Sequence, residues 1–166
     1  LKIDPQSLDA RIALGDLYAS EGKESEAVKE YVRALELDSQ NGDLYAKLAS
    51  LSMAHRHFGE AERYYRRWVE AAPSDEDAHM ALSEFYRSTG RLSEAVSSLQ
   101  RAREADPSSR TMHKAVIRLH LEANQFEEAE HEIALLLRRN DKDADGRILQ
   151  SRLVLEQGDT VKASQL

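Results

Sequence analysis

Apolar residues recur along the chain with the period of an amphipathic helix, and the same arrangement returns every 34 residues. In the first half of each of four units, two apolar positions three residues apart mark one face of a first helix. A second pair, also three residues apart, follows later in the unit and marks the face of a second helix. The first pairs are Leu14 and Leu17, Leu48 and Leu51, Leu82 and Phe85, and Val116 and Leu119; the second pairs are Tyr31 and Ala34, Tyr65 and Trp68, Leu99 and Ala102, and Ile133 and Leu136.

Alanine marks the same register throughout, at intervals of 34 residues. A period of this length is typical of stacked supersecondary units, none of which can bury its apolar face alone. The length of 166 residues therefore counts repeats, and it allows about five. The alanines are Ala27, Ala61, Ala95, Ala129 and Ala163.

Turn-forming residues fall between the apolar segments and set the limits of the predicted helices. Gly22, Gly90, Asn124 and Gly158 separate the two helices of their units, because glycine and asparagine adopt the left-handed conformation at least cost. The second unit departs from this pattern, with Arg56 at the same place. The predicted helix pairs cover residues 8–20 and 24–37, 42–55 and 58–71, 76–88 and 92–105, 110–122 and 126–139, then 144–156 with a truncated 160–166.

These residues resemble the tetratricopeptide repeat (TPR), whose signature joins Leu-Gly and Tyr on a first helix to a turn Gly and to Ala, an aromatic residue and Ala on a second. The first unit matches with Leu14-Gly15, Tyr18, Gly22, Ala27, Tyr31 and Ala34. The resemblance implies an all-α fold, a right-handed superhelix of antiparallel helix pairs, or α-solenoid. We expect a single array over 1–166, with repeats at 8–41, 42–75, 76–109 and 110–143, a partial repeat at 144–166, and residues 1–7 as the tail of a preceding repeat.

Composition narrows the class of partner. The formal charge of −7 and the isoelectric point near 5.4 argue against nucleic acid, because binders of phosphate backbones carry a basic surface. No window approaches 18 apolar residues, so direct membrane insertion is not expected. The chain has no cysteine, which fits the cytosol, slightly preferred here, and the periplasm alike. Both ends look cut, and we expect a piece of a longer chain whose uncapped array ends would allow self-association.

Candidate catalytic and metal-binding chemistry is weak. His79 and His113 share one register and His120 lies on the same predicted helix as His113, but they take the places of aromatic residues in the repeat. We interpret them as packing residues with one ring nitrogen satisfied by backbone or solvent. No phosphate-binding glycine loop, nucleophile elbow or HExxH motif accompanies them. The sequence therefore predicts no catalytic residues, no metal site, no cofactor and no enzyme.

The resemblance implies instead a partner-binding groove lined by the second, fifth, ninth and twelfth residues of each first helix. These positions are mainly acidic in the first three repeats and basic in the last two, with apolar residues between them. Such a groove would orient an extended or helical peptide of opposite polarity. The candidate contacts are Asp9, Ile12, Asp16, Asp43, Met53, Asp77, Met80, Glu84, Arg87, Lys114, Arg118, Leu121, Ile148, Arg152 and Leu155.

The predicted function is a non-catalytic scaffold that binds a peptide or a helix of a protein partner in this groove. The alternative is a regulatory or substrate-guiding arm of a larger enzyme, or of a bacterial export or polysaccharide-secretion assembly, which rests on analogy of fold. Arginines also gather on the second helices, including Arg63, Arg66 and Arg67. We interpret most of them as a solvated face, with a second protein contact or an anionic surface as the alternative.

Overall fold

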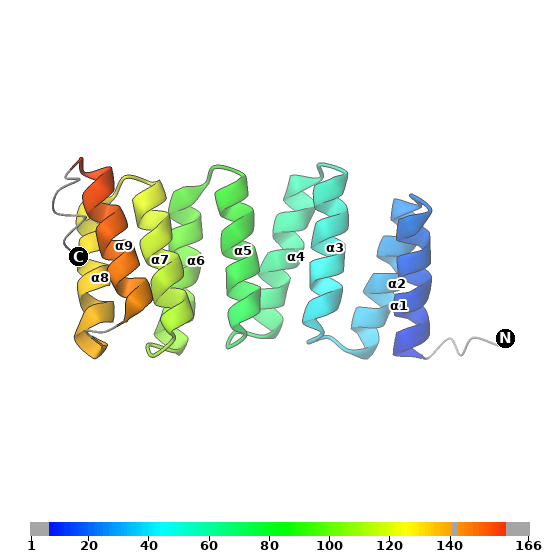
Figure 1. Ribbon diagram of the computed structural model, residues 1–166. Helices are drawn as coiled ribbons and strands as arrows, with labels where there is room; N and C mark the ends of the chain where they lie inside the picture. The colour runs from blue at the N-terminus through cyan, green and yellow to red at the C-terminus, as the bar shows by residue number, and fades with distance from the viewer. Residues whose placement is uncertain (1–6, 141–142, 159–166) are drawn as a thin grey trace. The chain divides into compact units, whose positions relative to one another are not determined.

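The computed structural model describes residues 7–140 and 143–158, and within these ranges it contains nine α-helices and no strand (Figure 1). Successive helices run antiparallel and are joined by short turns. The helices are α1 (Leu8–Ser20), α2 (Glu24–Leu37), α3 (Gly42–Ala54), α4 (Phe58–Ala71), α5 (Glu76–Ser88), α6 (Leu92–Ala105), α7 (Arg110–Glu122), α8 (Phe126–Arg139) and α9 (Ala144–Glu156). The predicted all-α class of paired helices is confirmed.

The predicted limits of these helices hold, with one small difference. Helix α3 ends at Ala54, one residue earlier than expected, because His55 is its C-cap with φ −91° and ψ 6°. The truncated helix expected over 160–166 and nearly all of the expected tail over 1–7 lie outside the described residues.

Side-chain caps start the first helix of each pair. Ser7, Asn41, Ser109 and Asp143 accept a hydrogen bond from the backbone N–H three residues further on. Such a cap satisfies one of the N–H groups that a helix start leaves without an intrahelical acceptor. At the start of α5, Asp75 accepts in the same way from the N–H of Asp77, at 2.9 Å. Polar residues between repeats therefore fix where each first helix begins.

The turn inside each pair uses one conformation throughout. Gly22, Arg56, Gly90, Asn124 and Gly158 all have positive φ, between 56° and 87°. After the first four of them, the next N–H donates to the carbonyl five residues earlier, as Lys23 does to Tyr18 at 2.9 Å. This is the bond of a Schellman motif, which ends a helix and reverses the chain. Arg56 adopts the conformation that the repeat requires although it is not a glycine.

The chain divides into two compact units, Leu1–Leu82 and Ser83–Leu166, with the boundary inside α5. In the first unit α1 packs on α2, α2 on α3 and α3 on α4. Two buried clusters hold these helices together, one around Leu44 and Leu48 and the other around Tyr45 and Trp68. Trp68 is thus a packing residue, and its Nε1 donates to Asp75 Oδ2 at 2.9 Å.

Small residues on first helices admit large side chains from second helices. A Cβ added to Gly15 would lie 2.5 Å from the Tyr31 ring, and one added to Gly42 would lie 2.8 Å from Trp68. Neither distance is sterically allowed for carbon atoms in contact. The glycine of the repeat signature at residue 15 is therefore required by packing, because α1 and α2 approach closely over the Tyr31 ring.

In the second unit α6 packs on α7, α7 on α8, and α9 against both α7 and α8 (Figure 1). Its core joins Ile117 and Leu121 of α7 to Ile133 and Leu136 of α8 and to α9. The alanines at the 34-residue register are fully buried wherever the structure describes them, at Ala27, Ala61, Ala95 and Ala129. Ala163 lies outside the described residues.

Candidate functional site

The candidate site follows the first helices, whose second, fifth, ninth and twelfth positions share one face. In the first unit this face belongs to α1, α3 and the start of α5. Its acidic residues Asp9, Asp16, Asp43 and Asp77 are exposed, while Ile12, Met53 and Met80 are half-buried. The face therefore presents carboxylates around partly covered apolar side chains.

Asp16 is the most constrained of these carboxylates. Its Oδ1 accepts hydrogen bonds from the Tyr31 hydroxyl of α2 and from Lys47 Nζ of α3, both at 2.7 Å. Partial loss of hydration opposes ionisation, but the two hydrogen bonds outweigh it and hold the pKa of the Asp16 carboxyl below its ordinary value. Burial, followed by the bond to Asp16, raises the pKa of Tyr31. Asp16 thus ties three helices together and is partly neutralised.

In the second unit the same face belongs to the end of α5, to α7 and to α9. Glu84, Arg87, Arg118, Ile148, Arg152 and Leu155 are exposed there, and Lys114 is half-buried. Leu121 is only 2% exposed and packs in the core with Ile117 and Ile133. The prediction that Leu121 contacts a partner is therefore wrong, because its side chain faces the packed interior and offers no surface.

Several of the predicted basic contacts are occupied by acidic neighbours. Lys114 Nζ lies 2.5 Å from Asp145 Oδ2 on the next first helix. Arg87 pairs with Glu84 of its own helix, at 2.6 Å, and with Glu122 of α7, at 3.3 Å. The hydrogen bond from Arg87, together with its charge, holds the pKa of Glu84 below its ordinary value. The basic end expected from the sequence is therefore weaker than the count of basic residues suggests.

What remains is an exposed patch on α7 and α9, which we call the α7–α9 patch: Arg118, Ile148, Arg152 and Leu155. Arg118 forms no ion pair with any residue in the described ranges. Ile148 is 65% exposed and Leu155 is 51% exposed, seven residues apart on one face of α9. Arg152 lies between them and pairs with Glu156 at 2.8 Å. The patch combines an unpaired guanidinium with two exposed aliphatic side chains.

Arg118 holds the ninth position of α7, and the aliphatic residues lie on the next first helix, α9. Asp16 holds the same ninth position on α1, and it reaches Lys47, the sixth residue of the next first helix. The sixth residue of α9 is Leu149, which is buried in the core and directly follows Ile148. Helix α7 packs against α9, so the patch lies on two neighbouring helices.

The histidines are packing residues, as the sequence predicts. His79 is buried and its Nε2 lies 3.0 Å from the Pro73 carbonyl, to which it donates. His113 makes the same contact with the Pro107 carbonyl at 3.4 Å. Tyr45, at the same register, donates its hydroxyl to the carbonyl of Ser39 at 3.1 Å. In the second, third and fourth repeats this position of the first helix therefore bonds back to the preceding inter-repeat turn.

Glu132 of α8 is a buried charge that the sequence analysis did not single out. Its carboxylate accepts from Arg103 of α6 and lies 3.3 Å from His113 Nδ1 of α7. Burial opposes its ionisation, but these two partners hold the pKa of Glu132 below its ordinary value. The network joins three helices and lies beside a hollow lined by Gln100, Arg103, Glu104, Pro107, His113 and Leu135.

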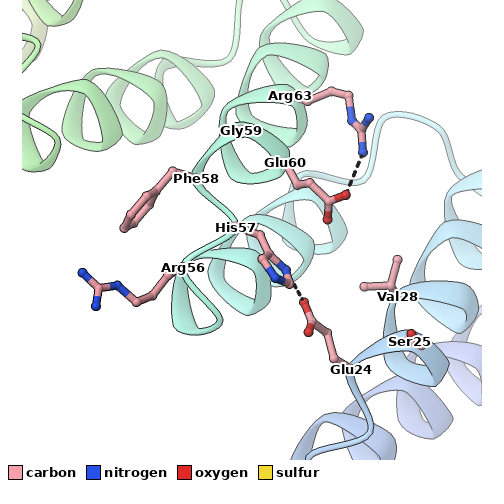
Figure 2. Close-up of a pocket in the computed structure, with 9 residues that line it drawn as sticks. All are labelled: Glu24, Ser25, Val28, Arg56, His57, Phe58, Gly59, Glu60 and Arg63. Carbon is pink, nitrogen blue, oxygen red and sulfur yellow. Dashed lines mark hydrogen bonds and ion pairs between the residues drawn. The ribbon is translucent and has the colours of Figure 1, made fainter.

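A larger hollow, of about 820 Å³, lies between the start of α2 and the turn that joins α3 to α4 (Figure 2). Glu24 crosses it to His57, with its carboxylate 3.1 Å from His57 Nδ1. Arg56 and Phe58 project from the same side of the turn in Figure 2, away from Glu24. Sequence reasoning missed this hollow, although Val28 on the outward side of a helix was a signal for it.

None of the helices in the described ranges is long and apolar enough to cross a membrane. No group of three His, Cys, Asp or Glu side chains in those ranges is placed to hold a metal ion.

The paired helices, the buried alanine register and the exposed first-helix faces define a helical-repeat protein. Three profiles described as tetratricopeptide repeat or TPR repeat match the sequence, at residues 15–53, 47–110 and 86–153. Together they cover residues 15–153, and the chain belongs to the tetratricopeptide repeat family. A comparison with curated proteins finds no significant match.

Solved structures share the fold at low sequence identity. A tetratricopeptide repeat protein from Parabacteroides merdae is 18% identical with a TM-score of 0.65, over 98% of this chain and 63% of its own. YrrB, described as a TPR protein with an unusual peptide-binding site, is 18% identical with a TM-score of 0.61, over 98% of this chain and 84% of its own. A chain from the structure of Naa15/Naa10 bound to HypK-THB is 19% identical with a TM-score of 0.66. The match covers 96% of this chain and 25% of that one. The chain thus spans less than two thirds of the Parabacteroides protein.

Proposed function

We propose that this chain is a protein-interaction scaffold that holds a peptide along its first-helix faces, and that the α7–α9 patch is the principal contact. The tetratricopeptide repeat fold supports the general role, since its members are in general non-catalytic scaffolds for protein partners. The particular surface is our own assignment.

Two features support the proposal: Arg118 is exposed without an ion-pair partner in the described ranges, and Ile148 and Leu155 are exposed on α9, which packs against α7. Exposed aliphatic side chains gain free energy when a partner covers them, at about 25 cal/mol per Å² of apolar surface. A guanidinium without an internal partner keeps its donors for a carboxylate, and Arg–carboxylate pairs are often bidentate. The preferred ligand is therefore a peptide in which an acidic residue stands next to aliphatic or aromatic side chains.

The acidic face of the first unit is a separate surface with its own charge preference in this proposal. Asp9, Asp43 and Asp77 are exposed, and they would repel a segment with further acidic residues while attracting a basic one. Electrostatic complementarity of this kind acts mainly on specificity and on association rate. The alternative role, as an arm of a larger enzyme or secretion assembly, stays a prediction from family analogy.

A pulldown with the 166-residue chain as bait tests the patch. Arg118→Glu combined with Ile148→Asp should remove most of the partner recovered by the wild type. Arg138→Glu is the matched control, because it reverses an exposed arginine on second helix α8. Circular dichroism should show that all variants keep their helix content. Equal recovery by the wild type and the double variant would show that the patch does not bind the partner.

A further inference from the structure

We propose a second docking site on the opposite side of the N-terminal repeats, a trough between second helices α2 and α4 that accepts an amphipathic helix of a protein partner. The helix would present apolar side chains to α2 and acidic side chains to α4. This site does not include the first-helix faces, so it stands or falls independently of the function proposed above.

Two hollows lie in line between α2 and α4, and both belong to the first unit. The first, of about 820 Å³, is lined by Ser25 and Val28 of α2 and by Glu60 and Arg63 of α4 (Figure 2). The second, of about 610 Å³, is lined by Val32 and Leu35 of α2 and by Arg67 and Glu70 of α4.

The lining residues follow helical spacing on both walls. Ser25, Val28, Val32 and Leu35 are separated by three or four residues, and so are Glu60, Arg63, Arg67 and Glu70. Residues at these spacings line one face of a helix, so the two hollows form one trough along both helices. Each helix has 14 residues, which gives a length of about 21 Å at a rise of 1.5 Å per residue. A partner helix of three to four turns would match this length.

The inner part of the trough is apolar. Tyr45 and Tyr64 line it and are buried, and the Tyr45 hydroxyl is already bonded to the Ser39 carbonyl. Val32 is 38% exposed, and Val28 and Leu35 are half-buried. Val28 and Leu35 also pack against the core from one side, so Val32 is the most exposed of the three. This apolar row of α2 is the feature that a partner helix would cover.

The α4 wall supplies the charge that selects the occupant. Arg67 makes no ion pair in the part of the chain that the structure describes. Arg63 lies 3.5 Å from Glu60 and 5.8 Å from the centre of the Tyr64 ring, and the side chains of Arg63 and Glu60 are half or more exposed. Like charges four residues apart on a helix are mildly unfavourable. Acidic side chains on the partner would relieve this repulsion and pair with both arginines.

Two carboxylates also line the second hollow, together with Arg67. Glu36 and Glu70 both line the second hollow, and neither has an ion-pair partner among the described residues. A basic side chain on the partner would fit there. Acidic residues on the partner would thus pair with Arg63 and Arg67, and a basic residue would pair with Glu36 or Glu70.

The second unit provides an internal comparison. Its hollow between α6 and α8 lies two 34-residue periods, or 68 residues, further along the chain, where Gln100, Arg103 and Leu135 replace Val32, Leu35 and Arg67. That hollow is smaller, about 430 Å³, and Arg103 is engaged by the buried Glu132. The apolar row and the unpaired arginine are thus features of the first unit, and we assign the docking site to that unit alone.

A peptide library displayed against the 166-residue chain tests this site. The library consists of 14-residue amphipathic helices with Leu, Ile, Phe or Met on one face and Glu, Gln or Lys flanking it. We expect the wild type to enrich peptides with Glu flanks at least tenfold over those with Lys flanks, because of Arg63 and Arg67. Arg67→Glu should reverse this preference toward Lys, and Val32→Asp should abolish enrichment.

Arg66→Glu is the matched control, because Arg66 neighbours Arg67 on α4 but lies outside the trough, 3.7 Å from Glu62. It should leave the Glu preference within about twofold of the wild type. The proposal is overturned if the wild type enriches no helical peptide, or if Arg66→Glu and Arg67→Glu shift the preference equally. Sedimentation that shows wild-type dimers dissociated by Val32→Asp would also overturn it, since the occupant would then be a second copy. Circular dichroism and thermal unfolding check that each variant is folded.

Discussion

At the scale of single residues, the turn of the second repeat stores backbone strain. Arg56 has φ 61° where the first, third and fifth repeats have glycine. The left-handed conformation is unfavourable for non-glycine residues because their Cβ approaches the following carbonyl oxygen. The strained residue is exposed and projects from the turn beside the large hollow (Figure 2).

Arg56→Gly should therefore stabilise the chain by about 0.5–1 kcal/mol, because glycine adopts this conformation without strain. Chemical unfolding followed by circular dichroism measures the change. Gly22→Ala is the reciprocal variant, at φ 73° and with open space around an added Cβ. Gly22→Ala should destabilise the fold by about 1 kcal/mol, because alanine is strained at this φ while its Cβ meets no neighbour. A destabilised Arg56→Gly variant would contradict the assignment of strain.

A second residue-scale prediction concerns acid sensitivity at Glu132. Its folded-state pKa is lowered, so its contribution to stability is complete above the unfolded-state pKa, about 4.3. That contribution is lost as the pH falls through the lower folded-state pKa. Glu132→Gln should cost about 1–3 kcal/mol at pH 7, because Arg103 and His113 lose a charged acceptor.

The cost of Glu132→Gln should shrink as the pH falls from the unfolded-state pKa, about 4.3, through the lower folded-state pKa, where the wild-type carboxyl becomes neutral like the Gln amide. Urea unfolding of both proteins at pH 7 and pH 3 measures this difference. A cost that stays constant between the two pH values would show that the ionised carboxylate does not stabilise the fold.

Residue chemistry was only partly predictable from the sequence. The packing role of His79 and His113 followed from their register, because aromatic residues occupy the same place in the repeat. The ion pair between Lys114 and Asp145 could not be predicted, because the two residues lie 31 residues apart on different helices. Such a pair depends on the stagger between neighbouring first helices, which no local pattern encodes.

At the scale of helices, capping accounts for the regular start of each first helix. Asn41 accepts from the Leu44 N–H at 3.2 Å, and its own side-chain amide donates to Asp38 at 3.0 Å. Asn41→Ala should cost about 1 kcal/mol, the usual effect of losing an N-cap. Gln40→Ala, at the exposed neighbouring residue, should change little. Thermal unfolding compares the two, and equal effects would show that the cap does not stabilise α3.

Helix limits were accessible from the sequence because breakers and caps recur in register. Proline follows α4 and α6 at residues 73 and 107, and positive-φ residues follow the first helices. Both signals are local, so they need no knowledge of tertiary packing. The trough between α2 and α4 was not accessible in this way. Its walls belong to helices 34 residues apart in the chain, and only packing brings them together.

At the scale of the whole molecule, the two units carry different surfaces on a shared repeat. The first unit has exposed carboxylates on its first-helix face and an apolar, arginine-lined trough between its second helices. The second unit has the α7–α9 patch, with exposed aliphatic residues and Arg118. Residues outside the packing register vary most between repeats, and the proposed binding surfaces consist of such residues.

Amide chemical-shift mapping would locate peptide binding on the first-helix face of the second unit. The ¹⁵N-labelled chain would be titrated with a peptide taken from the partner recovered in the pulldown. We predict that the largest shifts fall on α7 and α9 around Arg118, Ile148 and Leu155, and that Arg118→Glu with Ile148→Asp weakens binding at least tenfold. Shifts confined to other helices, with unchanged affinity of that double variant, would contradict the account.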